Sequence, residues 1–303
     1  MSHDLLQALA IFAAGLAAGT INTVVGSGTL ITFPTLLAFG YPPVLANVSN
    51  NVGLVPGGFS GAHGYRAELA GQRRRVLRLG TASLCGGLAG AILLLVLPAG
   101  AFKAIVPALI GIALVMVVFQ PRLAAWVAAR QRARAAAPTG GAEGAGDAGD
   151  AGDAGDGPVG PGVAVGAAVR TGAVGVIRPV SPQAALQVGG PVLWVLVFAS
   201  GVYGGYFGAA QGVLLLGLMG VAFTDSMQRI NAVKNVLAGL VNGVAAVVFI
   251  CATHVDWGAA GLIAAGSILG GQLGARIGRK LPPWALRAAI ICVGTVALVK
   301  LLA

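Results

Sequence analysis

Long apolar runs, separated by short polar or basic stretches, make up most of the chain. A helix of roughly 20 residues, rising about 1.5 Å per residue, crosses a hydrocarbon core of about 30 Å. Runs close to that length predict helices at 5–25, 44–62, 76–97, 104–119, 191–207, 231–251, 257–275 and 285–303. Two other runs, at 28–39 and 212–223, are too short to cross such a layer. The pattern therefore predicts membrane-crossing helices together with two short segments.

Each short segment follows a glycine-rich break in the chain. The first break is Gly26-Ser27-Gly28, and the second is Gly204-Gly205-Tyr206-Phe207-Gly208. Irregular backbone at membrane depth is stable only where protein or a water-filled cavity satisfies its polar groups. We therefore expect half-helices or re-entrant segments, with ten segments in all if the short ones cross and about eight if they do not.

Composition places the chain in a membrane. Of its 303 residues, 57% are hydrophobic and 9% are charged, whereas soluble proteins carry about 25% charged residues. The 49 glycines do not indicate a disordered chain, because the mean hydropathy is +0.88. The predicted fold class is an all-α polytopic membrane protein, located as a multi-pass protein in the plasma or inner membrane, whose small residues allow close helix packing.

One segment differs from the rest in composition. Residues 135–188 are rich in Ala, Gly and Pro, and Ala-Gly-Asp occurs four times in succession from Ala145 to Asp156. Calcium-binding β-rolls also use glycine and aspartate, but this stretch lacks their longer period and apolar position. We therefore expect a first membrane repeat at 1–134, a flexible cytoplasmic linker at 135–188 and a second membrane repeat at 189–303.

The two halves resemble each other weakly but in a constant order. At a single offset, Gly28 falls on Gly212, Asn47 on Asn231 and Asn51 on Asn235. Basic clusters lie at 73–78, 122–134 and 276–280, between apolar runs, as cytoplasmic loops require. This placement explains the net charge of +10 without a nucleic acid. It also puts the end of segment 44–62 inside and that of its counterpart 231–251 outside. The sequence thus predicts two inverted-topology repeats with short broken or re-entrant helices and outer termini, an architecture common among secondary transporters.

Polar residues gather at corresponding places in the two halves. The candidate substrate-binding residues are Asn22, Thr23, Ser27, Thr29, Asn47, Ser49, Asn50, Gln211, Asn231, Lys234 and Asn235, and the candidate backbone or hinge positions are Gly26, Gly28, Gly208 and Gly212. Helix starts and neutral donors favour an anion, and Lys234 adds a positive charge. A cation path would need buried carboxylates, and Asp225 lies where it can cap a helix.

Each of these residues also has a purely structural interpretation. Asn and Ser in membrane helices often only join helices by hydrogen bonds, and Lys234 can extend to the membrane surface. No catalytic triad, phosphate-binding loop, metal cluster or cofactor motif is recognisable. We therefore expect no enzymatic activity, no metal and no cofactor.

Two paired motifs resemble a known family. They are the stretch from Gly19 to Gly28, continuing through Pro34, Pro42-Pro43 and 46–50, and the stretch from Gly201 to Gly208, followed by Asn231-Ala232-Val233-Lys234-Asn235. Both resemble the TauE/SafE family of sulfite-exporter-like permeases, which includes four-toluene-sulfonate-uptake-type proteins. Ser27 and Thr29 stand where members often have Gly and Ser, and the linker is longer than the family leads us to expect.

The resemblance implies an inner-membrane permease that exports sulfite or an organosulfonate-like anion by alternating access. Its partners would be a small anionic substrate and the lipid bilayer, and the pattern allows a homodimer. Two alternatives stay open. One is a membrane-embedded scaffold or assembly factor without transport, and the other is a carrier of a different small solute, such as a cation or an amine.

Overall fold

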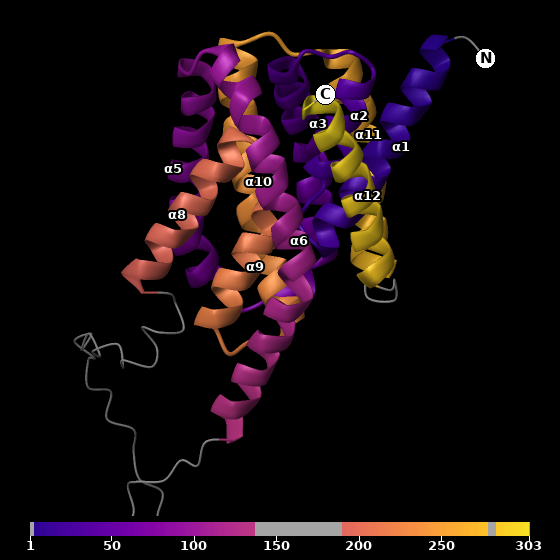
Figure 1. Ribbon diagram of the computed structural model, residues 1–303. Helices are drawn as coiled ribbons and strands as arrows, with labels where there is room; N and C mark the ends of the chain where they lie inside the picture. The colour runs from indigo at the N-terminus through magenta and orange to yellow at the C-terminus, as the bar shows by residue number, and fades with distance from the viewer. Residues whose placement is uncertain (1–2, 137–189, 278–282, 303) are drawn as a thin grey trace, which may run out of the picture.

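The computed structural model describes residues 3–136, 190–277 and 283–302, and every regular element in these ranges is an α-helix. The first half contains α1 (His3–Val24), α2 (Thr29–Ala38), α3 (Pro43–Gly64), α4 (Arg66–Leu69), α5 (Arg73–Val96) and α6 (Ala99–Ala136). The second half contains α8 (Pro191–Tyr206), α9 (Gln211–Ala222), α10 (Met227–Ala252), α11 (Trp257–Ile277) and α12 (Pro283–Leu302). The helices form one bundle (Figure 1).

The predicted helices are confirmed within a few residues, with one exception. The prediction ended a helix at residue 119 and treated 122–134 as a cytoplasmic loop, which is wrong. Helix α6 continues through Pro121 and the basic cluster to Ala136, because Arg and Ala are good helix formers even without apolar residues. Its basic end extends beyond the other helices (Figure 1). Most of the expected linker, at 137–188, lies outside the described residues.

Five helices of the described ranges are long and apolar enough to cross a membrane. They are Asp4–Val24, Arg73–Val96, Gly100–Arg122, Met227–Ala252 and Trp257–Arg276. Helices α2, α8 and α9 are apolar but shorter. The chain is therefore a multi-pass α-helical membrane protein.

Helices α1 and α2 form a hairpin whose two ends lie close together. Gln7, near the start of α1, donates a hydrogen bond of 3.5 Å to the Tyr41 hydroxyl, which follows α2. Helices α8 and α9 form a second hairpin. Trp194, at the start of α8, bonds Thr81 of α5 over 3.1 Å, and Asp225, after α9, bonds Arg75 of the same helix over 2.6 Å. The end of α2 therefore lies at the same end of the bundle as the start of α1, and the end of α9 lies at the same end as the start of α8.

The two halves exchange partners. Helix α1 packs mainly on α11 of the other half, and α8 packs correspondingly on α5. Small residues make this contact close. A Cβ added to Gly205 would lie 2.2 Å from the Gly87 carbonyl oxygen, and one added to Gly270 would lie 2.1 Å from that of Leu16. Without a hydrophobic force between helices in lipid, such close packing supplies much of the association energy.

Candidate functional site

The chain breaks twice in the same way, once in each half. After α1, the N–H groups of Val25 and Gly26 both donate to the Ile21 carbonyl, over 2.7 and 3.0 Å. After α8, the N–H groups of Phe207 and Gly208 both donate to the Tyr203 carbonyl, over 3.0 and 3.2 Å. Gly26 has a φ of 90° and Gly208 a φ of 79°. This helix ending requires a left-handed residue, which explains both glycines.

The two breaks touch each other. The N–H of Gly212 donates to the Gly26 carbonyl over 3.1 Å, and a Cβ on either glycine would lie 2.4 Å from the other's Cα. Gly28 is equally crowded, since its Cβ would lie 2.6 Å from the Ala18 carbonyl oxygen. A side chain at Gly26 or Gly212 would force the two halves apart, and a side chain at Gly28 would push α2 away from α1.

The C-terminal ends of α1 and α8 are capped by donors from the opposite half. Asn231 and Asn235 of α10 donate to the Thr23 carbonyl over 3.0 and 3.3 Å. The Lys234 ammonium donates to the Asn22 and Thr23 carbonyls over 2.8 and 3.3 Å. Asn47 of α3, the counterpart of Asn231, donates to the Tyr206 carbonyl over 3.0 Å. These donors offset the partial negative charge of both helix ends.

At the N-terminal ends of α2 and α9 no side chain takes this capping role, although the Gly212 N–H of α9 donates to the Gly26 carbonyl. Neither helix has a side-chain cap. Among the described residues, the N–H groups at the first position of each helix, in Thr29 and Gln211, donate to no backbone carbonyl. The Ser27 hydroxyl and the Gln211 amide nitrogen also lack hydrogen-bond partners there, although these side chains are 0% and 3% exposed. Two positive helix ends therefore meet beside unused donors.

A short hydrogen-bond network supports the start of α2. The Asn50 amide nitrogen donates to the Thr29 hydroxyl over 3.4 Å, and the Asn50 carbonyl oxygen accepts from the Thr32 hydroxyl. An added Cβ on Gly208 would lie 3.8 Å from the Thr29 hydroxyl, so Thr29 faces the second break. Thr32 was not among the predicted substrate-binding residues, although its position three residues after Thr29 puts both on one helix face.

The structure therefore brings most of the predicted residues to the two breaks. The hydroxyl groups of Thr23 and Ser49, however, bond elsewhere. The Thr23 hydroxyl donates to the Gly19 carbonyl of its own helix over 2.9 Å, so only its backbone takes part. The Ser49 hydroxyl accepts from the Asp256 N–H over 2.9 Å, and thus holds the connection between α10 and α11. Asn22 contributes its carbonyl, in the bond with Lys234.

Asp225 is not the helix cap that its position indicated. The cap of α10 is Ser226, whose hydroxyl accepts from the Arg229 N–H. The Asp225 carboxylate instead binds two arginines, Arg75 of α5 over 2.6 Å and Arg229 of α10 over 3.2 Å. A carboxylate next to two guanidinium groups gains more from ion pairing than from a helix end.

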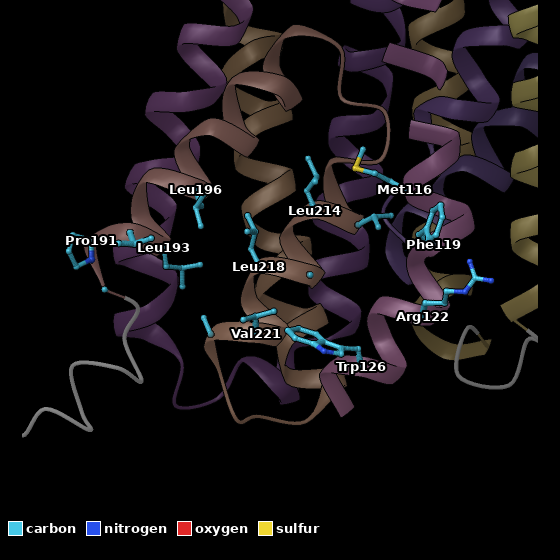
Figure 2. Close-up of a pocket in the computed structure, with 15 residues that line it drawn as sticks. Met116, Phe119, Arg122, Trp126, Pro191, Leu193, Leu196, Leu214, Leu218 and Val221 are labelled. Atoms are coloured by element: carbon cyan, nitrogen blue, oxygen red, sulfur yellow. The ribbon is translucent and has the colours of Figure 1, made fainter. Parts of the chain in front are cut away.

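A cavity lies between α6, α8 and α9 (Figure 2). It has a volume of about 940 Å³, and apolar side chains such as Leu196, Leu214 and Leu218 line it. Arg122 and Trp126 lie at its end on α6. None of the predicted substrate-binding residues lines this cavity. Its chemistry suits apolar chains, so we do not assign an anion to it.

Comparison with known proteins places this architecture in a family. The model of the sulfite exporter TauE/SafE family matches residues 11–301, almost the whole chain. A "Probable membrane transporter protein ORF9" from Sinorhizobium sp is 32% identical over 105 residues. That alignment covers 34% of this chain and 40% of the relative, so the chain matches less than half of the relative's length. No solved structure matches. The chain belongs to the TauE/SafE family of membrane transporters.

Proposed function

We propose that the protein is a permease that binds a small oxyanion between the two chain breaks and moves it across the inner membrane unchanged. One observation carries this proposal. The negative ends of α1 and α8 are capped by amide and ammonium donors, while the positive ends of α2 and α9 have no side-chain cap. The positive ends of the two helices therefore make the region between the breaks electropositive.

The residues divide into two roles. Ser27, Thr29 and Gln211 lie at the starts of α2 and α9, and Asn50 of α3 contacts Thr29 there. We propose that these four residues offer hydroxyl and amide donors to an anion. The residues that hold the helix ends in place are Asn22, Thr23, Asn47, Asn231, Lys234 and Asn235. Gly26, Gly28, Gly208 and Gly212 allow the two breaks to approach. Among the described residues, no carboxylate hydrogen-bonds to either break, which favours an anion over a cation.

The substrate class follows from the family together with this chemistry. The family is described as sulfite exporters, and a sulfite or sulfonate group presents oxygens that can accept from several donors at once. Export of a monoanion from a cell with a negative interior is favoured by about 2.3 kcal/mol per 100 mV. Outward movement of such an anion therefore needs no coupled ion.

The exchange of helix partners supports two inverted repeats and alternating access. Hairpin α1–α2 starts at the end of the bundle where α12 finishes, and hairpin α8–α9 starts at the opposite end (Figure 1). Each hairpin packs on the other half, and the two breaks contact each other. We therefore expect both breaks to move when one half rocks against the other. Ser27 and Gln211 are buried, as an occluded state of the proposed transport cycle would require.

Flux measurements test this function. Purified protein in liposomes should carry sulfite and small sulfonates when a voltage is imposed, and should not carry alkali cations or amines. Binding of these anions should also raise the thermal stability of the protein, because a ligand of the native state adds RT ln(1 + [L]/Kd). If no sulfur oxyanion produced either flux or thermal stabilisation, the proposal would be overturned and a scaffold would be favoured.

A further inference from the structure

A cluster of charged side chains joins the two halves at the end of the bundle that the positive-inside rule places in the cytoplasm. Arg75, at the start of α5, donates to one carboxylate oxygen of Asp225 over 2.6 Å, and Arg229, at the start of α10, donates to the other over 3.2 Å. The Arg75 guanidinium also lies 3.8 Å from the centre of the Phe223 ring. We call Arg75, Asp225 and Arg229 the cytoplasmic cluster.

Further hydrogen bonds show that the cytoplasmic cluster fastens one half to the other. The Gln72 amide donates to the Arg229 carbonyl over 3.1 Å, and the Arg229 guanidinium donates to the Ala70 carbonyl over 3.3 Å. All these bonds cross from the region before α5 to the start of α10. At the opposite end, Ser49 and Asp256 join the halves through a neutral bond, and no ion pair between described residues does so.

The chemistry of the cytoplasmic cluster is that of an oxyanion site. Two guanidinium groups hold one carboxylate, each through a different oxygen, so these two ion pairs contain two positive groups and one negative group. Guanidinium forks bind carboxylate, sulfonate and similar oxyanions through the same paired oxygens. The cluster lies at the end of α9, whose first residue is Gln211 of the proposed anion site. Twelve residues of helix separate the two places by about 18 Å.

We propose that the cytoplasmic cluster is a second anion site, at the cytoplasmic entrance, where the Asp225 carboxylate holds the place of an incoming oxyanion. This inference rests on the proposed function. An anion arriving from the cytoplasm binds Arg75 and Arg229 and displaces Asp225. Because Asp225 precedes α10 and Arg75 belongs to α5, this exchange breaks the ion pair that fastens the halves and lets the cytoplasmic side open toward Gln211.

Sulfite transport measured separately from each face tests the inference. With sulfite on the cytoplasmic face of inside-out vesicles, Arg75→Gln should raise the KM about tenfold, the loss expected for one charged hydrogen bond. The KM for sulfite on the outer face should stay unchanged. Asp225→Asn removes the competing carboxylate and should lower the cytoplasmic KM. The matched control is Arg78→Gln, an exposed arginine of the same helix, which should leave both values unchanged.

The outcomes separate this inference from the proposed function. Wild-type protein that moves no anion would overturn both. Wild-type flux combined with an unchanged cytoplasmic KM in Arg75→Gln, or an increased one in Asp225→Asn, would overturn the second site alone. If Arg75→Gln does not fold, Arg75→Lys keeps the charge without the planar fork. Arg75→Lys should raise the KM for sulfite on the cytoplasmic face only. Equal increases of the KM on both faces would contradict the inference.

Discussion

At the scale of single residues, several buried polar side chains bind the backbone of the other half. Lys234 is fully buried, yet two of its three N–H donors go to the last carbonyls of α1. Asn47 and Asn231 do the same for opposite hairpins. These contacts give Lys234 a role in placing the proposed anion site, by holding the end of α1 close to the start of α2.

Replacement of Lys234 tests this role. Lys234→Met keeps the length of the side chain but removes its donors, so carbonyls at the end of α1 lose their partner at a cost of about 1–3 kcal/mol. We expect a folded protein with a lower melting temperature and no sulfite flux. Asn242→Leu changes a buried residue of the same helix for which the structure shows no hydrogen bond to either break, and should keep its flux. Normal flux in Lys234→Met would contradict this role.

At the scale of elements, the two breaks depend on glycine for two separate reasons, backbone conformation and space. Gly26 and Gly40 both have a positive φ, of 90° and 85°. Only Gly26 is crowded, because its Cβ would lie 2.4 Å from Gly212, whereas nothing lies within 4 Å of a Cβ on Gly40. The two positions therefore separate the cost of conformation from the cost of contact between the halves.

Alanine at these two glycines should have unequal effects. Gly40→Ala should lower the free energy of unfolding only by the conformational term, about 1–2 kcal/mol. Gly26→Ala carries the same term and in addition pushes the two breaks apart, so it should be clearly less stable and should lose transport. Thermal unfolding in detergent measures the difference. Equal stability of the two variants would show that the breaks do not pack as described.

The sequence predicted the elements better than their contacts. Apolar run length and the glycine breaks located the helices within a few residues, since both signals are local. The end of α6 was missed because a basic, alanine-rich stretch has no apolar pattern even though it forms a helix. The partners of Lys234 and Asp225 were not predictable, because carbonyls of Asn22 and Thr23 and the guanidinium of Arg75 come from the other half of the chain.

At the scale of the whole molecule, the proposed inverted arrangement predicts opposite exposure of equivalent helix ends. His63 lies at the end of α3 and His254 just after α10, and both are exposed. In a variant with Cys85, Cys251 and Cys292 replaced by alanine, an impermeant maleimide applied to intact cells should label His254→Cys. His63→Cys should react only after the membrane is opened. Labelling of both positions from one face would contradict inverted repeats.

We propose that an oxyanion passes between the starts of α2 and α9. Gln211→Glu tests it most directly, because glutamate has nearly the same shape as glutamine but puts a negative charge where the anion should bind. In liposomes with an imposed voltage, wild-type protein should carry sulfite, and Gln211→Glu should lose this flux while its thermal stability stays close to that of the wild type. Sulfite flux in Gln211→Glu equal to that of the wild type would contradict the claim.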